Sequence, residues 1–290
     1  MSENDNARAL SRARVFFGAL AALIGFYGAF AVIVVALTIV LPDPWLDGMW
    51  GQAVSVVVML VAAVVVNLAL VVRGWATWKT LGWNGGVRDR AAFAFGTVFG
   101  LAVAFVALSI ALVIGEARIE FTGEAFTAYL LVAGQVGLVL LVAALAEELL
   151  FRGYPLARLA VPVGKVGASV ALAVVFAGAH ILNPEVSTLG LVNIGLASLV
   201  LSAAFFTPGG LPLAWGIHLG WNGGLALGAD APVSGLTFDI PALEFVTGRS
   251  AWLTGGTFGP EGGIAASVAM GVALIWLSQR ATRAGEGERT

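Results

Sequence analysis

The sequence contains no cysteine, only two histidines and few charged residues. The absence of cysteine excludes disulfide bonds, thiolate metal ligands and a cysteine nucleophile. Charged residues make up 11% of the 290-residue chain and the net charge is −2, so we expect no nucleic-acid partner. Few side chains remain for chemistry, and both histidines, His180 and His218, lie within apolar segments.

Apolar residues dominate the chain. They make up 59% of it and the mean hydropathy is +0.95, well beyond a soluble domain. A helix needs roughly 20 apolar residues to cross a bilayer, and continuous apolar runs favour helices over strands. The sequence therefore predicts an all-α polytopic membrane bundle of about eight transmembrane helices embedded in the lipid bilayer. The predicted spans are 15–41, 52–72, 91–115, 129–150 with a continuation to about 158, 166–182, 189–206, 211–227 and 263–277.

We expect one transmembrane domain, residues 14–280, between cytoplasmic tails at 1–13 and 281–290. The first apolar run is too long for a signal-peptide core, so we expect an uncleaved helix. Twelve of the fifteen Lys and Arg residues fall on one side of an eight-span arrangement, which predicts cytoplasmic termini. The connection 228–262 lies on the opposite side. Its sequence does not decide between capping the bundle and re-entering it, and we interpret its Gly-rich end at 259–263 as a turn.

Three ionisable residues, Glu147, Glu148 and Arg152, end the fourth apolar run. A charge at bilayer depth costs at least about 2.5–3.5 kcal/mol, so such groups normally face a polar cavity. Glu148 and Arg152 are four residues apart, and this spacing predicts an ion pair on one helix face. Glu147 is turned by about 100° from Glu148 and is left to face a cavity. The alternative is that Glu147 simply ends the helix at the membrane interface.

Each histidine has a partner four residues away, Phe176 before His180 and Asn222 after His218. A lone histidine in an apolar helix usually makes a hydrogen bond between helices. Two histidines, each with such a neighbour, favour a site instead. If the fourth helix continues past its apolar run, the helical rise places Glu147, both histidines and Asn222 in one layer.

These residue types suit peptide hydrolysis. A carboxylate and an imidazole can hold and deprotonate a water molecule, while a second imidazole and an amide can donate to an oxyanion. Two imidazoles and a carboxylate also suit catalytic zinc, with Glu147, His180 and His218 as ligands. The His-Glu-x-x-His pattern of zinc proteases is absent. We expect no cofactor and keep zinc as the alternative.

Three motifs follow one another on successive membrane segments: Glu-Glu-x-x-x-Arg at 147–152, Phe-x-x-x-His at 176–180 and His-x-x-x-Asn at 218–222. Together they resemble the motifs of the CAAX protease and bacteriocin-processing (CPBP, or Abi) family. The resemblance covers a core at residues 129–227. Within the family, the sequence is similar to the CAAX prenyl endopeptidase. It implies an intramembrane endopeptidase acting on a membrane-associated protein or peptide.

The resemblance also implies residue roles. Glu147 and His180 would activate water, and His218 and Asn222 would hold the oxyanion. Glu148, Arg152 and Phe176 would support them. The resemblance implies a glutamate protease that needs no metal and lies in a bacterial-type plasma membrane. It does not identify the substrate or show whether the substrate is prenylated.

Two alternatives come from other classes. A non-proteolytic bacteriocin self-immunity or scaffold protein would bind a peptide without cleaving it. A proton-coupled transporter would use buried Glu and His side chains as a relay, but we find no inverted repeat of the kind that transporters carry. The intact motifs favour the enzyme, because a pure binder needs neither both histidines nor Glu147.

Overall fold

The computed structural model describes residues 3–41 and 48–287, and their side chains over 11–41 and 51–281. Within these ranges it is an all-α membrane bundle, as predicted, and six of its helices are long and apolar enough to cross a bilayer. The long helices are α1 (Glu3–Ile39), α2 (Gly48–Val72), α3 (Gly86–Val113), α4 (Phe126–Glu148), α5 (Tyr154–Ala179), α6 (Thr188–Phe205), α7 (Gly210–Ala229) and α9 (Ile264–Gly287).

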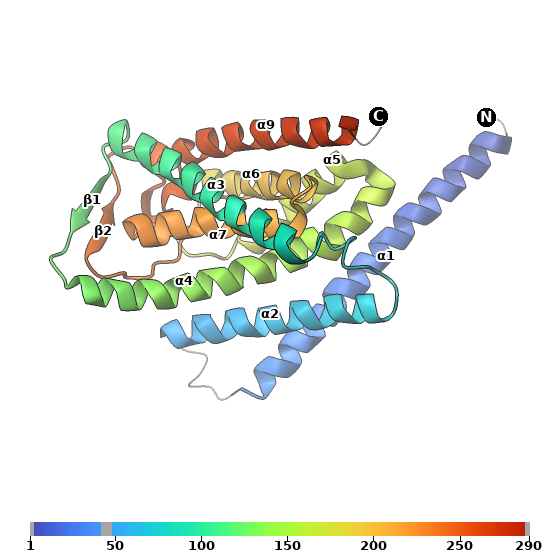
Figure 1. Cartoon of the computed structure of the whole chain (residues 1–290), viewed down its shortest axis with the longest axis horizontal. Helices are drawn as coiled ribbons and strands as arrows, with labels where there is room; N and C mark the ends of the chain where they lie inside the picture. The colour runs from blue at the N-terminus through green and yellow to red at the C-terminus, as the bar shows by residue number, and fades with distance from the viewer. Residues whose placement is uncertain (1–2, 42–47, 288–290) are drawn as a thin grey trace.

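Six apolar helices are compatible with eight predicted spans. The longest apolar run, 126–179, contains α4, the π-helix η2 (Leu149–Gly153) and α5, and α5 breaks at Gly164 with φ 77°. The fourth helix therefore continues beyond residue 150, as predicted, and the fifth begins after Gly164. α7 is not among the six, because glycine, histidine and asparagine lower its hydropathy. α1 begins and α9 ends at the same end of the bundle (Figure 1), as an even number of crossings requires.

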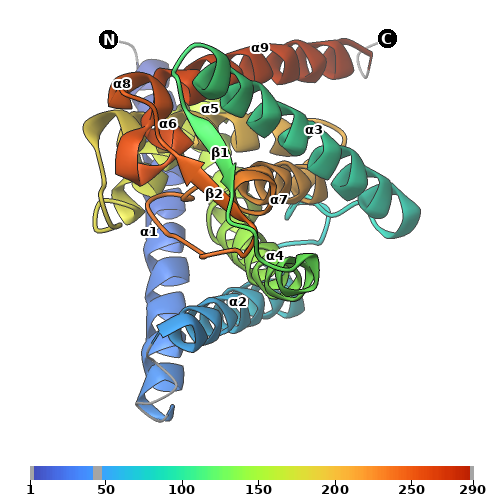
Figure 2. The same cartoon turned by 90° about the vertical axis from the view of Figure 1, so that its left-hand side faces the viewer.

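A small sheet at the opposite end was not predicted. Strand β1 (Arg118–Phe121) pairs antiparallel with β2 (Leu243–Val246), with Ile119 opposite Phe245. It joins the α3–α4 connection to the segment 228–262, whose conformation the sequence left open. After β2 that segment forms the short helix α8 (Ala251–Thr254) and two 3₁₀ turns, η3 (Gly256–Phe258) and η4 (Pro260–Gly262), before α9 (Figure 2). Its residues cap this end of the bundle.

α3 and α7 pack backbone against backbone. A Cβ atom on Gly96 or Gly100 of α3 would collide with a carbonyl oxygen of α7, and one on Gly216 or Gly220 of α7 would collide with a carbonyl oxygen of α3. A Cβ atom on Gly224 would instead meet the side chain of Ala104 on α3. The pairs Gly96–Gly100 and Gly220–Gly224 thus serve close helix packing, as their spacing predicts.

Candidate active site

The first motif lies where α4 ends and η2 begins. Every residue of η2 is buried, and Pro155, two residues later, has no N–H with which to continue the α-helical pattern. Glu148 is 0% exposed and Arg152 1%. Glu148 Oε1 lies 3.3 Å from Arg152 Nη1, so the predicted ion pair is confirmed. Each charge is thereby offset within the bundle.

His218 of α7 joins this pair. Its Nδ1 lies 2.8 Å from Glu148 Oε1, and its Nε2 lies 3.8 Å from Glu147 Oε2. An ionised carboxylate can only accept a hydrogen bond, so Nδ1 carries a proton and donates a hydrogen bond to Glu148. Glu148 is therefore shared by Arg152 and His218 and links α4 to α7. The sequence analysis did not predict this contact, because 70 residues separate the partners.

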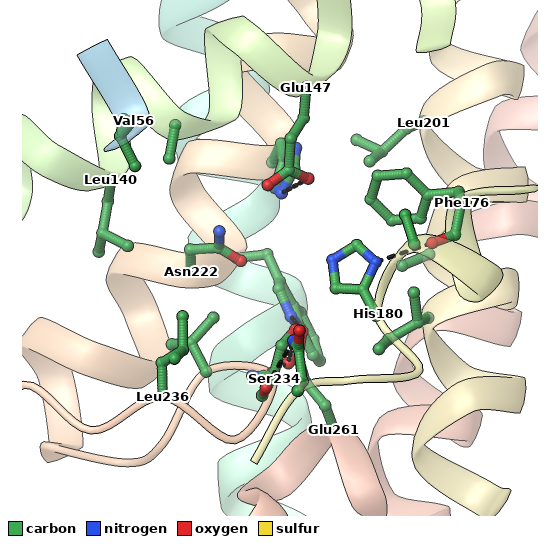
Figure 3. A pocket seen from close by; sticks show the side chains of 18 of the residues that line it. Val56, Leu140, Glu147, Phe176, His180, Leu201, Asn222, Ser234, Leu236 and Glu261 are labelled. Carbon is green, nitrogen blue, oxygen red and sulfur yellow. Dashed lines mark hydrogen bonds and ion pairs between the residues drawn. The ribbon is translucent and has the colours of Figure 1, made fainter. Parts of the chain in front are cut away.

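His180 lies one residue past the end of α5, so the fifth helix is shorter than its predicted range of 166–182. The Nδ1 of His180 lies 2.7 Å from the carbonyl oxygen of Phe176, and the two rings are 4.7 Å apart. A carbonyl oxygen accepts only, so Nδ1 is the protonated nitrogen. In the neutral ring, Nε2 is then the acceptor. It points into the space bordered by Glu147, Asn222 and Glu261 (Figure 3).

Phe176 stands at the centre of the motif residues. The guanidinium of Arg152 lies 4.4 Å from the centre of its ring, and the ring of His218 is 6.4 Å away in an edge-on arrangement. Its own carbonyl holds His180. One aromatic side chain thus contacts residues of all three motifs, and its position on the buried face of α5 fixes their spacing.

One cavity of about 660 Å³ brings the predicted catalytic residues together. Glu147, His180, His218 and Asn222 all line it, and Figure 3 shows Glu147, His180 and Asn222 around the space. Glu148 and Arg152 are buried and are not among its lining residues. Glu147 is the more accessible glutamate, with 23% of its side chain exposed. This arrangement suits a cavity role for Glu147. The apolar part of the wall includes Phe30 of α1, Val56 and Met59 of α2, and Val139 and Leu140 of α4.

Several buried polar atoms of the first motif have no hydrogen-bond partner in the part of the chain that the structure describes. They are Glu147 Oε2, Glu148 Oε2, Arg152 Nε and Arg152 Nη2. The 3.8 Å between Glu147 and His218 is too long for a hydrogen bond. A buried polar atom without a partner costs about 1–3 kcal/mol. A bound water molecule, strain or a functional role explains such atoms in other proteins.

A third carboxylate lines the cavity and was missed. Glu261 of η4, interpreted as part of a turn, accepts hydrogen bonds from Trp221 Nε1 at 2.7 Å, from Ser234 Oγ at 2.8 Å and from the Ser234 backbone N–H. Trp221 lies between His218 and Asn222 on α7. The sequence did offer a signal, because Glu261 is the only charged residue between Arg249 and Arg280.

The alternative metal ligands Glu147, His180 and His218 share the cavity, but they are not close enough together to form a metal site. Over the described ranges, no group of three or more His, Asp or Glu side chains is placed to hold a metal ion. The Nδ1 atoms of the two histidines bond to the Phe176 carbonyl and to Glu148, which leaves the Nε2 atoms as the nitrogens that would bind a metal ion.

The comparison with protein families gives one match. Residues 129–224 match the family model described as Type II CAAX prenyl endopeptidase Rce1-like. The matched range contains all seven site residues predicted from the sequence, and it leaves out α1, α2 and Glu261. The comparison with curated proteins gives no match.

Proposed function

Because residues 129–224 of this integral membrane protein belong to the CAAX protease family, we propose that it hydrolyses a peptide bond of a membrane-associated protein or peptide. The observation that carries the proposal is the shared cavity. Glu147 reaches it from α4, His180 from the end of α5, and His218 and Asn222 from α7. α4 and α5 are joined by η2, whereas α7 comes later in the chain, after α6. The fold therefore brings residues from separate segments to one cavity.

Glu147 and His180 are proposed to activate the water molecule. The Nδ1–H of His180 is held by the Phe176 carbonyl, which leaves Nε2 to accept a hydrogen bond from water in the cavity. Glu147 lines the cavity and 23% of its side chain is exposed, so it can take the proton of that water. The water oxygen then forms a bond to the carbonyl carbon of the substrate.

His218 and Asn222 are proposed to stabilise the tetrahedral oxyanion. Four residues on α7 place them one turn apart on the same face, and both line the cavity. When His218 is doubly protonated, Glu148 holds its Nδ1–H, and its Nε2–H, 3.8 Å from Glu147 Oε2, is left without a hydrogen bond among the described residues. The Asn222 amide supplies a second donor. Donors fixed in advance in this way need no reorganisation when the charge develops.

Glu147 is also proposed to complete the reaction. The proton that it took from water passes to the leaving amide nitrogen as the oxyanion re-forms the carbonyl group and the carbon–nitrogen bond breaks, which yields a carboxylic acid and an amine. The acid then passes its own proton to the amine, so that the products are a carboxylate and an ammonium group. Every proton is thereby accounted for without a metal ion. We propose this glutamate-type mechanism in a bacterial-type plasma membrane, with both termini cytoplasmic. The Lys and Arg distribution and the common end of α1 and α9 support that orientation.

The test uses purified protein reconstituted into liposomes. Two synthetic peptides of one sequence are offered first, one with a farnesylated cysteine near its carboxyl end and one without the farnesyl group. Detergent-extracted membrane proteins are then added as a wider pool. Mass spectrometry identifies new peptide termini, and the Glu147→Gln variant is the matched control.

New termini that appear with the wild type and are missing with Glu147→Gln are the expected result. Cleavage of the farnesylated peptide alone would show that the prenyl group is recognised. The same set of termini from both proteins, or none from either, contradicts the proposal. In the second case peptide binding without cleavage points to the immunity or scaffold alternative.

A further inference from the structure

The π-helix η2 depends on hydrogen-bond donors from other helices. The hydroxyl of Tyr27 on α1 donates to the carbonyl oxygen of Leu150 at 3.0 Å, and Asn67 Nδ2 on α2 donates to that of Leu149 at 3.4 Å. In a π-helix the carbonyl of Leu150 would pair with the residue five positions on, which is Pro155 and has no N–H. Tyr27 supplies the donor that the helix itself lacks.

Packing adds to these hydrogen bonds. Phe26 stacks on Tyr154 with ring centres 5.7 Å apart, and the ring of Tyr27 lies 6.4 Å from that of Phe151. α1 therefore contacts both the π-helix and the residue that follows it. The contact is specific in orientation, because the Tyr27 hydroxyl and ring meet η2 together.

Asn67 holds η2 from the side of α2. It is 2% exposed, and its Nδ2 also donates to the carbonyl oxygen of Ala63 at 2.8 Å, which fixes the amide. A Cβ atom on Gly153 would lie 3.4 Å from Asn67 Oδ1, so the amide is close to the last residue of the π-helix as well. α1 and α2 thus support η2 through two separate contacts.

Any shift of η2 would move the catalytic glutamate, because Glu147 and Glu148 immediately precede it and Arg152 lies within it. Resting on the proposed function, we propose that Tyr27 is a positioning residue, assisted by Asn67. It holds η2 so that Glu147 stays in line with His180 and His218. α1 and α2 lie outside the matched range 129–224, so this support comes from the part of the chain that the family match does not cover.

The chain contains a matched control. The hydroxyl of Tyr129, at the start of α4, donates to the carbonyl oxygen of Leu227 at 2.9 Å, and it is part-buried like that of Tyr27. Tyr27→Phe and Tyr129→Phe each delete one hydroxyl and one bond between helices. Only Tyr27 bonds to η2. The pair therefore separates a loss of general stability from a loss of positioning.

The experiment measures kcat and KM on the peptide cleaved in the liposome assay, and the melting temperature in detergent. Both variants should melt at similarly lowered temperatures. Tyr27→Phe should lower kcat by about 10- to 100-fold, since small displacements of reacting groups have effects of this size, and leave KM near the wild-type value. Tyr129→Phe should keep the wild-type kcat. Asn67→Leu is expected to act like Tyr27→Phe.

A wild-type kcat in Tyr27→Phe, an equal loss of kcat in both tyrosine variants, or a change confined to KM overturns the positioning role. If Tyr27→Phe does not fold, Asn67→Leu decides by the same criteria, and failure of both to fold assigns a purely structural role. Glu147→Gln is measured in parallel. If it retains turnover the proposed function fails, whereas loss in Glu147→Gln with wild-type kcat in Tyr27→Phe removes only the positioning role.

Discussion

Two glutamates line the cavity, Glu147 and Glu261, and their surroundings are built differently. Glu147 and Glu148 face the cationic or protonatable side chains of Arg152 and His218, and four polar atoms of this group lack hydrogen-bond partners within the described residues. Glu261, on another wall, accepts three hydrogen bonds from the neutral donors of Trp221 and Ser234. Its backbone carbonyl is held as well, by Asn193 Nδ2 at 2.7 Å.

Under the proposed function, the difference separates a glutamate that reacts with water from one that holds the cavity wall in place. A carboxylate with three donors has little capacity left for water, and any movement would break bonds that are already made. A carboxylate with an unpartnered oxygen can bind and deprotonate water without such loss. The arrangement of hydrogen bonds therefore distinguishes Glu147 from Glu261, and so does burial, because Glu147 is partly exposed and Glu261 is buried.

The largest effect is expected at Glu147. Glu147→Gln should lower kcat by about 10²–10⁴-fold, the usual contribution of a general base, and His180→Ala should have an effect of the same order. Neither change removes much packing, so membrane insertion and the melting temperature should stay close to wild type. Kinetics on the cleaved peptide and detergent melting check both points. Near wild-type kcat in either variant would remove that residue from the chemistry.

A mixed effect is expected at Glu148. Glu148→Ala leaves Arg152 buried without its partner, which should cost about 3–5 kcal/mol of unfolding free energy, and it also frees His218. Turnover should fall together with stability. The matched control is Glu116→Ala, which removes an exposed ion pair with Arg249 worth about 0–1 kcal/mol. Lost turnover with unchanged denaturant unfolding would mean that Glu148 serves the chemistry alone.

A smaller effect, on stability only, distinguishes Glu261. Glu261→Gln keeps the shape of the side chain but turns an N–H₂ group toward Trp221 or Ser234, which donate to Glu261. This loss of an acceptor should cost about 1–3 kcal/mol of unfolding free energy. Turnover per folded molecule should fall far less than in Glu147→Gln. Denaturant unfolding and active-site-normalised kinetics give the two quantities. A loss of turnover equal to that of Glu147→Gln would make both carboxylates catalytic and abolish the distinction.

No effect is expected from chelators. If the mechanism needs no metal, treatment with EDTA or 1,10-phenanthroline should leave the turnover of the purified protein unchanged, and metal analysis should find no stoichiometric zinc. The zinc alternative forecasts one equivalent, its loss in His218→Ala, and activity that chelation abolishes and zinc restores. That set of results would replace the glutamate mechanism.

Local patterns predicted much of this protein. Apolar runs gave the membrane helices, because helix formation and burial in lipid depend on neighbouring residues. The four-residue spacing gave the Glu148–Arg152 pair for the same reason. The order of the motifs and their depth in the membrane predicted which residues lie together at the cavity. Their catalytic roles stay predictions.

Contacts between distant segments could not be predicted in this way. The Glu148–His218 bond depends on how far α4 and α7 rotate about their axes, which no spacing within either helix specifies. The carbonyl of Leu150 needs the Tyr27 hydroxyl because Pro155 has no N–H, and Pro155 lies 128 positions after Tyr27 in the chain. β1 and β2 have four residues each, too few to show a periodicity, and they pair across more than 100 residues. Glu261 was missed because its glycine-rich surroundings are typical of a turn.

The glycine contact between α3 and α7 has a consequence for how such a protein can diversify. Main-chain atoms of the two helices touch, so Gly96, Gly100, Gly216 and Gly220 cannot gain even a methyl group. These main-chain contacts set the distance between α3 and α7, whichever other side chains α7 turns to the cavity. Under the proposed function, substitutions at the other cavity-facing positions of α7 would change the room for a substrate while the backbone positions of His218 and Asn222 stay the same.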